Sequence, residues 1–320
     1  MAGDLTRIPF GRTDLQVTRL CQGTAFRTLD RSQDDGRALE VLQHCLEAGV
    51  RFFDSANAYG WGGSERLLGQ ALQGAPEDVV VCTKVSPRRE DRQDVVVPFT
   101  DSLLRECVDR SRQRLQRDVI DLYLLHQPDG TTPAQTLCAR MQRLIDAGAI
   151  SYWGVSNHPP EMVEALLQAA ETAGTSLPVG VEDYLTIGGG ALTDEGKSRT
   201  RWYRECMLPL LRGAGLGLIA FSPMDRGDLA PGRQVEAGSP LATLCEDLDA
   251  VAGELGVTRS QVCVAWVLHQ EGVTSVLGGA ESPEHVDEMI AGTRLHLPQK
   301  ALESLELASD RYADAMESTA

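Results

Sequence analysis

Four residues of the sequence could together perform acid–base chemistry. They are a carboxylate, a phenol, an ammonium group and an imidazole, and each lies at or just after the end of an apolar, strand-like run: Asp54, Tyr59, Lys84 and His126. Taken singly, each has an ordinary explanation. An aspartate after a strand is typically a turn residue or a helix cap, and a lone lysine, tyrosine or histidine is typically solvated or packed. Their joint significance depends on whether the fold brings them together.

The elements that must position these residues alternate along the chain. The sequence predicts eight strands at 17–21, 51–54, 79–85, 120–126, 151–156, 179–182, 217–221 and 273–277, and eight helices at 37–48, 64–72, 103–115, 133–147, 159–173, 203–214, 260–270 and 283–291. In the first helix, Leu39, Leu42 and Leu46 recur at helical spacing. Such alternation predicts a parallel sheet with helical crossovers.

Two parallel architectures compete. An open, doubly wound dinucleotide-binding sheet needs a G-x-G-x-x-G turn after its first strand, and residues 22–26 lack this pattern. Residues 8–17 are typical of a hairpin, and no linker or low-complexity segment divides the chain. We therefore predict an α/β fold: a (β/α)8 TIM barrel with an N-terminal β-hairpin, as one domain over residues 1–320.

A barrel would gather the four polar residues at one end. Active sites of such barrels form at the carboxyl ends of the strands. Because side chains alternate along a strand, the aspartate shares a face with Phe52, the lysine with Cys82 and the histidine with Leu124. If those faces point inward, the four groups converge at the mouth. The long connections 85–100, 183–202 and 222–257 start at the same end.

Composition narrows the partners. The chain has 30 Lys and Arg against 46 Asp and Glu, a formal net charge of −16, which argues against nucleic acid and anionic membranes. The longest apolar runs are far shorter than the ~20 residues that span a bilayer, and residues 1–7 lack the apolar region of a secretory signal. No two of the eight cysteines have CxxC spacing. We expect a cytoplasmic protein with reduced thiols and no metal site.

A family resemblance appears at these same residues. The segment Phe53–Gly60, followed by Ser64, Glu65, Leu68 and Gly69, resembles the aldo-keto reductase signature. Later motifs match in order: Cys82-Thr83-Lys84, Leu124-Leu125-His126, Gly154-Val155-Ser156-Asn157, Phe221-Ser222-Pro223-Met224 and Gly278-Gly279-Ala280-Glu281-Ser282-Pro283-Glu284. These matches cover roughly residues 6 to 291.

The resemblance implies an oxidoreductase that uses NADP(H) or NAD(H) to reduce aldehydes or ketones, sugars among them, to alcohols. Tyr59 would supply the proton. A free tyrosine has a pKa of about 10, and the neighbouring Lys84 cation would lower it. Asp54 would hold Lys84 charged and in place, while His126 would donate a hydrogen bond that orients the substrate oxygen.

The resemblance also implies a set of cofactor-binding residues. Ser156 and Asn157 would bind the carboxamide, Phe221 would stack on the nicotinamide ring, and the backbone near Ser222 would approach the pyrophosphate. The segment from Gly279 and the following helix start would hold the adenosine end. The full set is Gly23, Thr24, Ser156, Asn157, Phe221, Ser222, Pro223, Met224, Gly227, Gly279, Ala280, Glu281, Ser282, His285 and Glu288.

The chain departs from the family pattern in several places. Gly180 stands where the family has a carboxamide-binding glutamine, Met289 where it often has asparagine, and His285 where it has arginine or glutamine. Residues 186–200 are longer than expected, which predicts a reshaped substrate pocket. Residues 279–285 carry two carboxylates and no arginine or lysine. Because Glu281 could accept hydrogen bonds from an unphosphorylated ribose, we expect weak discrimination between NADH and NADPH.

Other functions stay open. The chain also resembles the beta subunits of potassium channels, so a cofactor-binding regulatory subunit with little turnover is the main alternative. A barrel aldolase or isomerase with Lys84 as a Schiff base is a third, although it leaves the 278–282 loop without a role. Arg88, Arg89 and Arg92 could meet an anionic or polyhydroxy substrate. The sequence does not predict an oligomeric state.

Overall fold

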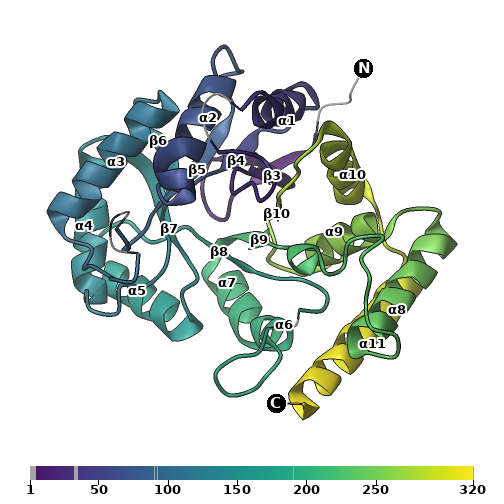
Figure 1. Ribbon diagram of the computed structural model, residues 1–320. Helices are drawn as coiled ribbons and strands as arrows, with labels where there is room; N and C mark the ends of the chain where they lie inside the picture. The colour runs from purple at the N-terminus through teal and green to yellow at the C-terminus, as the bar shows by residue number, and fades with distance from the viewer. Residues whose placement is uncertain (1–4, 32–34, 90, 92, 190, 320) are drawn as a thin grey trace.

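The computed structural model describes residues 5–31, 35–89, 91, 93–189 and 191–319, and it contains the predicted barrel (Figure 1). Eight parallel strands close in the order β10-β3-β4-β5-β6-β7-β8-β9. Their bounds are β3 Leu20–Gly23, β4 Phe52–Asp54, β5 Val80–Val85, β6 Ile120–Leu125, β7 Ile150–Ser156, β8 Gly180–Tyr184, β9 Gly217–Phe221 and β10 Ser275–Gly278. The prediction of a (β/α)8 barrel is confirmed.

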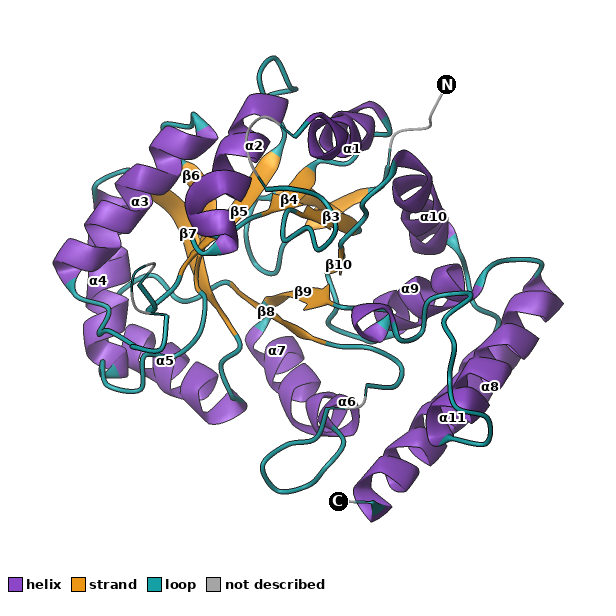
Figure 2. Ribbon diagram, viewed as in Figure 1, coloured by secondary structure: helices purple, strands orange, loops and turns teal. Residues whose placement is uncertain are grey.

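Helices surround the strands (Figure 2). They are α1 Gly36–Glu47, α2 Gly63–Ala71, α3 Asp101–Leu115, α4 Ala134–Asp146, α5 Pro160–Ala173, α6 Arg199–Trp202, α7 Leu208–Ala214, α8 Pro240–Leu255, α9 Arg259–His269, α10 Pro283–Arg294 and α11 Gln299–Ser318. Two short 3-10 helices, η1 Tyr59–Gly62 and η3 Asp225–Gly227, and a π-helix, η2 Tyr203–Met207, adjoin them. Among the described residues, no helix is both long and apolar enough to cross a bilayer.

The N-terminal hairpin closes one end of the barrel. It pairs β1 Arg7–Pro9 with β2 Gln16–Thr18. The predicted first strand, 17–21, is therefore wrong as a unit, because it is divided between this hairpin and β3. Phe10, in the hairpin turn, is fully buried, and its ring centroid lies 5.9 Å from that of Phe52 at the start of β4. The carboxyl ends of the strands therefore lie at the end of the barrel opposite the hairpin.

Side-chain alternation divides the core as the sequence predicted. Phe52, Cys82, Leu122 and Leu124 pack together inside the barrel, whereas Phe53 and Val81 belong to the larger core beneath the helices. The inward direction of the first set confirms the expected faces of β4, β5 and β6. Alternate positions of each strand therefore contribute to two different cores, one inside the barrel and one beneath the helices. The polar residues at the strand ends lie on the same face as the residues inside the barrel.

The two longest of the described helices were missed by the sequence analysis, as was the short α6. Residues 222–257, expected to be a long loop, contain α8, and α11 lies beyond the last predicted helix. These two helices lie side by side (Figure 1). The start of α8 was readable, because Ser239 caps its first turn and Pro240 occupies its first position. The hydroxyl of Ser309 in α11 donates to the carbonyl of Ile187 at 2.5 Å, so α11 anchors the long connection after β8.

Candidate active site

An ion pair buried in the barrel forms the centre of the site. Lys84 Nζ lies 2.6 Å from both Asp54 Oδ1 and Asp54 Oδ2, and it also donates to the carbonyl of Ser55 at 2.9 Å. Both charged side chains are at most 1% exposed. Burial alone would lower the pKa of Lys84, but Asp54 and Glu182 raise it well above its ordinary value. Lys84 is therefore a cation at neutral pH.

Tyr59 reaches this pair from the turn after β4. Its hydroxyl lies 3.2 Å from Lys84 Nζ, and the ammonium lies 4.9 Å from the centre of its ring. The turn is fixed by the backbone N–H of Asn57, which donates to Lys84 O at 3.1 Å, and by Ser86 N, which donates to Asn57 Oδ1 at 3.0 Å. Gly60 follows Tyr59 with a φ of 56°, which permits the tight turn.

The pKa of Tyr59 differs from the expectation. Burial raises it above its ordinary value, Lys84 acts in the opposite direction, and Asp54 and Glu182 add to the rise. The expectation of a lowered pKa is therefore wrong for the net direction, although the influence of Lys84 has the expected sign. The phenol is protonated at neutral pH, which is the state that a proton donor requires.

His126 completes the predicted four. It follows β6 directly, and its ring meets the Tyr59 ring edge to face with centroids 5.6 Å apart. Burial, and then the Lys84 cation, lower the pKa of His126 from 6.5 to about 3. The imidazole is neutral at physiological pH, with one ring nitrogen able to donate a hydrogen bond. The structure thus brings together all four residues that the sequence selected.

Two predicted cofactor residues lie beside His126 on the next strand. Ser156 ends β7, and Asn157 Nδ2 donates to the carbonyl of His126 at 3.1 Å and to Ser156 Oγ at 2.9 Å. The φ of Asn157 is 55°, in the left-handed region. This strained position and the two hydrogen bonds fix the side chain at the rim of the mouth.

Strained backbone gathers around the mouth. Of the six non-glycine residues with left-handed φ in the described part of the chain, five lie in loops that follow β4, β7 and β9: Trp61, Asn157, Ser222, Asp225 and Arg226. Such residues cost about 1–3 kcal/mol each, and they cluster at functional sites. The distribution therefore marks the same end of the barrel as the titratable groups do.

The loop after β9 carries the predicted nicotinamide and pyrophosphate residues. Phe221 is half-buried at the strand end, with its ring centroid 5.9 Å from that of Tyr184. The carbonyl of Pro223 accepts a hydrogen bond from Thr186 Oγ1 at 3.0 Å. The Met224 carbonyl accepts from Gly227 N at 2.8 Å, which closes the next turn. Phe221 therefore retains an aromatic face at the mouth, and the connection after β8 supports this loop.

Gly23 and Thr24 follow the same rim at β3. Gly23 pairs with Asp54 in register, and a Cβ there would lie 3.3 Å from the carbonyl of Gly278. Thr24 is fully buried, and its hydroxyl donates to Asp54 O at 3.1 Å. Both residues lie beside the site, and Thr24 also ties β3 to β4.

Glu281 is not the open ribose acceptor that we expected. Its Oε1 accepts from the backbone N–H groups of Arg27 and Thr28, the latter at 3.0 Å, and its Oε2 accepts from the Thr28 hydroxyl. The Arg27 guanidinium donates in turn to the carbonyl of Arg226 at 2.6 Å. These hydrogen bonds join the loops after β3, β9 and β10 to one another, and we call this set of contacts the clasp. The structure also brings a cation, Arg27, to a segment that has none of its own.

The remaining residues of the adenosine segment have mixed surroundings. Gly279 faces open space, the carbonyl of Ala280 accepts from Gln22 Nε2 at 3.2 Å, and Ser282 Oγ caps α10 by accepting from His285 N at 3.3 Å. His285 is exposed. Glu288 Oε1 instead accepts from the Thr258 hydroxyl of the neighbouring helix cap at 2.7 Å.

The assignment of Gly180 is corrected by the barrel register. Gly180 begins β8 at the closed end, where a Cβ would lie 2.4 Å from the Phe10 ring. The β8 residue in register with Ser156 is Glu182. Glu182 is 2% exposed, and its Oε2 lies 3.2 Å from Lys84 Nζ. Gly180 therefore lies away from the site, whereas Glu182, which the sequence analysis did not select, lies inside it.

The longer connection after β8 packs mainly on the outside of the barrel. A Cβ on Gly188 would lie 2.3 Å from Leu244 in α8, and Ser198 N donates to Glu317 Oε1 at 2.8 Å. Its effect on the substrate pocket therefore stays a prediction. After β5, Arg88 donates to Gln93 O at 2.6 Å and Arg89 pairs with Asp91 at 2.9 Å, while Arg92 lies outside the described residues.

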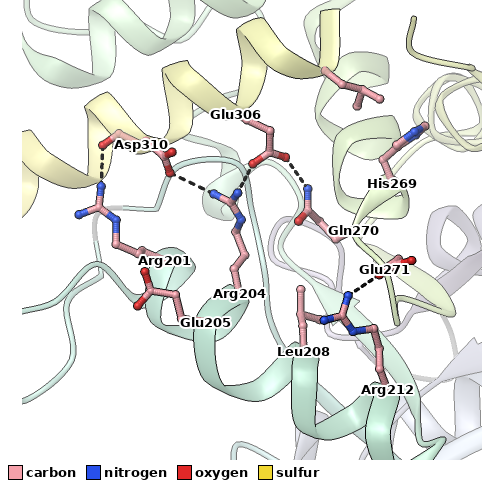
Figure 3. Close-up of a pocket in the computed structure, with 11 residues that line it drawn as sticks. Arg201, Arg204, Glu205, Leu208, Arg212, His269, Gln270, Glu271, Glu306 and Asp310 are labelled. Atoms are coloured by element: carbon pink, nitrogen blue, oxygen red, sulfur yellow. Dashed lines mark hydrogen bonds and ion pairs between the residues drawn. The ribbon is translucent and has the colours of Figure 1, made fainter. Parts of the chain in front are cut away.

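A separate cavity lies away from this chemistry. It is lined by residues of α6 to α7, the end of α9 and α11, among them Arg204, Arg212 and Glu306 (Figure 3). Its three arginines are paired: Arg201 with Asp314 and Glu317, Arg204 with Glu306 and Asp310, and Arg212 with Glu271. Because ion pairs neutralise these charges, the barrel mouth remains the better candidate for an active site.

Comparison with known proteins agrees with this geometry. The chain belongs to the Aldo/keto reductase family, whose model matches residues 19–310, and this is a family of oxidoreductases. The chain is 28% identical over 331 residues to a probable voltage-gated potassium channel subunit beta of Oryza sativa subsp. japonica, covering 96% of this chain and 94% of the relative. It is 28% identical over 318 residues to the uncharacterized oxidoreductase YrpG of Bacillus subtilis (strain 168), covering 92% and 93%.

A solved structure shares the fold. The holo form of the aldo-keto reductase AKR11C1 from Bacillus halodurans superposes with a TM-score of 0.79 at 23% sequence identity, covering 95% of this chain and 96% of that chain. This similarity supports the barrel topology.

Proposed function

We propose that the protein reduces an aldehyde or ketone to an alcohol with a nicotinamide cofactor, and that Tyr59 supplies the proton. The observation that carries this proposal is the Tyr59 hydroxyl 3.2 Å from a fully buried Lys84 ammonium. A phenol in that position can lose its proton and leave a tyrosinate that a fixed cation stabilises. A lysine and a tyrosine with only solvent-exposed roles would not be expected to lie in hydrogen-bond contact inside the barrel.

Each of the four residues at the barrel mouth has a separate role in the proposed reduction. Tyr59 gives its proton to the substrate oxygen as negative charge develops there, and Lys84 stabilises the resulting tyrosinate. Asp54 holds Lys84 through two 2.6 Å contacts, so the ammonium cannot turn away. His126, neutral because its pKa is about 3, can donate a hydrogen bond to the same substrate oxygen without adding a charge. Polarisation and proton transfer thus act on one atom.

The residues at the mouth suit a nicotinamide dinucleotide. Asn157 is fixed at the rim, Phe221 presents an aromatic ring, and the left-handed residues after β9 turn the backbone at the place expected for the pyrophosphate. When bound, the cofactor supplies the hydride for reduction or accepts it for oxidation. Both NADP(H) and NAD(H) remain candidates, because Arg27 and Glu281 place opposite charges at the adenosine end.

A second candidate function follows from the relative in rice. A protein similar to a channel beta subunit could bind the cofactor and serve mainly as a partner. The two functions predict different ratios of binding to turnover. The protonated Tyr59 beside Lys84 favours the enzyme, since a binding subunit has no need of a positioned proton donor.

The experiment that separates them measures binding and turnover on one preparation. Dissociation constants of both reduced cofactors are measured by fluorescence at one ionic strength. The decrease in reduced-nicotinamide absorbance is then followed with aldehydes, ketones and sugars. Steady turnover on at least one carbonyl supports the enzyme. Tight cofactor binding without turnover on any of them supports the regulatory subunit.

A further inference from the structure

Glu182 adds a second carboxyl group to the Asp54–Lys84 pair. It projects from β8 into the barrel, is 2% exposed, and places Oε2 3.2 Å from Lys84 Nζ. Potential ligand atoms of Asp54, Cys82 and Glu182 all lie within 4.8 Å of one another. The mechanism proposed above does not use Glu182, although its Oε2 lies 3.2 Å from the Lys84 ammonium that the mechanism does use.

The hydrogen bonds of Lys84 leave Glu182 without a proper donor. An ammonium group has three hydrogens. Four other acceptors already surround it: both Asp54 oxygens at 2.6 Å, the carbonyl of Ser55 at 2.9 Å and the Tyr59 hydroxyl at 3.2 Å. Glu182 Oε2 has no hydrogen-bond partner within the described residues, despite its closeness to the cation. An ionised carboxylate buried in this way is unfavourable, and a proton on it removes the penalty.

The surroundings of Glu182 favour its protonated form on balance. Burial raises the pKa of Glu182 well above its ordinary value, the Asp54 carboxylate on β4 raises it further, and Lys84 on β5 opposes them. The other titratable groups that face it are Cys21, Cys82 and Tyr59, whose own pKa values are raised and which are therefore neutral. With a proton on Glu182, the cluster of Lys84, Asp54 and Glu182 has no net charge. Without it, the cluster carries one negative charge.

We propose that Glu182 is a positioning acid that returns a proton to Tyr59 through Lys84 after each reduction. This role rests on the proposed function. The contacts form a continuous path, because Lys84 Nζ lies 3.2 Å from Glu182 Oε2 and 3.2 Å from the Tyr59 hydroxyl. Lys84 is the only link needed between the two, and it is held at the centre by Asp54.

The protons balance along this path. The Tyr59 O–H bond breaks as the O–H bond of the product alcohol forms. A Lys84 N–H bond then breaks and restores the Tyr59 O–H bond. The Glu182 O–H bond breaks and restores the Lys84 ammonium, which leaves Glu182 as a carboxylate. Glu182 recovers its proton from water when the product leaves, and the hydride is supplied by the reduced nicotinamide.

The first test asks where the proton lies, without any reaction. Infrared difference spectra at pH 7 compare the wild type with Glu182→Gln. We expect a protonated-carboxyl band that the variant lacks. Glu65→Gln is the matched control, because Glu65 is also fully buried but accepts from the Thr83 hydroxyl at 2.8 Å and from Arg114 at 3.0 Å. Identical spectra for wild type and Glu182→Gln would overturn the proposal.

The second test uses the reaction. Glu182→Gln keeps the shape but cannot give up a proton, so kcat for reduction should fall roughly tenfold or more, below the 10²–10⁴-fold of a direct proton donor. KM for the carbonyl should change little, and the solvent deuterium isotope effect on kcat should rise. Unchanged kcat and pH profile overturn the proposal. If the amide variant is unfolded by circular dichroism, Glu182→Leu takes its place in both assays, because leucine also has no proton to give up.

Failure of this inference is distinguishable from failure of the proposed function. If wild type turns over no carbonyl while the infrared band is present, the proposed function fails and the return of a proton to Tyr59 fails with it. If wild type turns over and Glu182→Gln matches it across pH, only the role of Glu182 is lost.

Discussion

Replacing Lys84 with methionine should destabilise the protein as well as inactivate it. Methionine retains much of the side-chain volume but leaves Asp54 without its cation in a position at most 1% exposed. Breaking one partner of a buried ion pair costs about 3–5 kcal/mol. Each kcal/mol shifts the melting temperature of a large domain by roughly 2 °C, so we expect a decrease of roughly 6–10 °C.

The pH of the measurement follows from the direction of the shift. The pKa of Lys84 is raised in the folded protein above its ordinary value of 10.5. Its contribution to stability is therefore complete below about 10.5 and is lost as the pH rises through the raised value. Melting curves by circular dichroism at pH 7.5 fall in the range where the whole contribution is present. Turnover is measured on the same samples at a temperature where both proteins are folded.

Two further variants separate the ion pair from a general effect of lysine removal. Lys300→Met is the matched control, because Lys300 is 88% exposed and its acidic neighbour Glu254 lies 4.0 Å away; its melting temperature should match wild type. Adding Asp54→Asn to Lys84→Met removes the uncompensated charge, so the double variant should melt above the single one. A Lys84→Met protein that melts with wild type would refute the reasoning.

Two other predictions concern titratable groups. Since His126 has a pKa of about 3 when folded and 6.5 as its ordinary value, the unfolded chain binds more protons below pH 6.5. As the pH decreases below 6.5, His126 should therefore lower the free energy of unfolding by about 1.4 kcal/mol per pH unit. Urea titrations of His126→Asn should show a smaller decrease in this free energy between pH 6.5 and pH 5. All eight cysteines are free and only Cys206 is exposed, so a bulky thiol reagent should modify one thiol rapidly in native protein and eight after denaturation without reductant. Fewer than eight would contradict the reduced state.

The features that the sequence predicts well depend on local pattern. Strand and helix alternation, and the inward faces of β4, β5 and β6, follow from the spacing of apolar residues within each segment. The joint placement of Asp54, Tyr59, Lys84 and His126 then needs only the rule that parallel strands end on one side. Each of these steps uses residues close together in the chain.

The features that it misses depend on how distant strands are aligned. The register of β8 against β7 places Glu182, rather than Gly180, beside Ser156. Comparison of a short sequence motif does not determine the register between two strands. The glutamate at the end of Gly180-Val181-Glu182 was nevertheless a visible signal, because a charged residue in a buried strand needs a partner. The clasp between Glu281 and Arg27 joins residues 254 positions apart. The pKa of Tyr59 depends on burial, which the sequence does not measure.

The most direct test of the account compares wild type with Tyr59→Phe in the absorbance assay, using the best carbonyl substrate. Tyr123→Phe is the control, because Tyr123 is fully buried and its hydroxyl has no partner among the described residues. Wild type and Tyr123→Phe should oxidise many equivalents of reduced nicotinamide per active site. Tyr59→Phe should be slower by at least 10²-fold, with cofactor affinity nearly unchanged. Equal rates for wild type and Tyr59→Phe would contradict the assignment of Tyr59 as the proton donor.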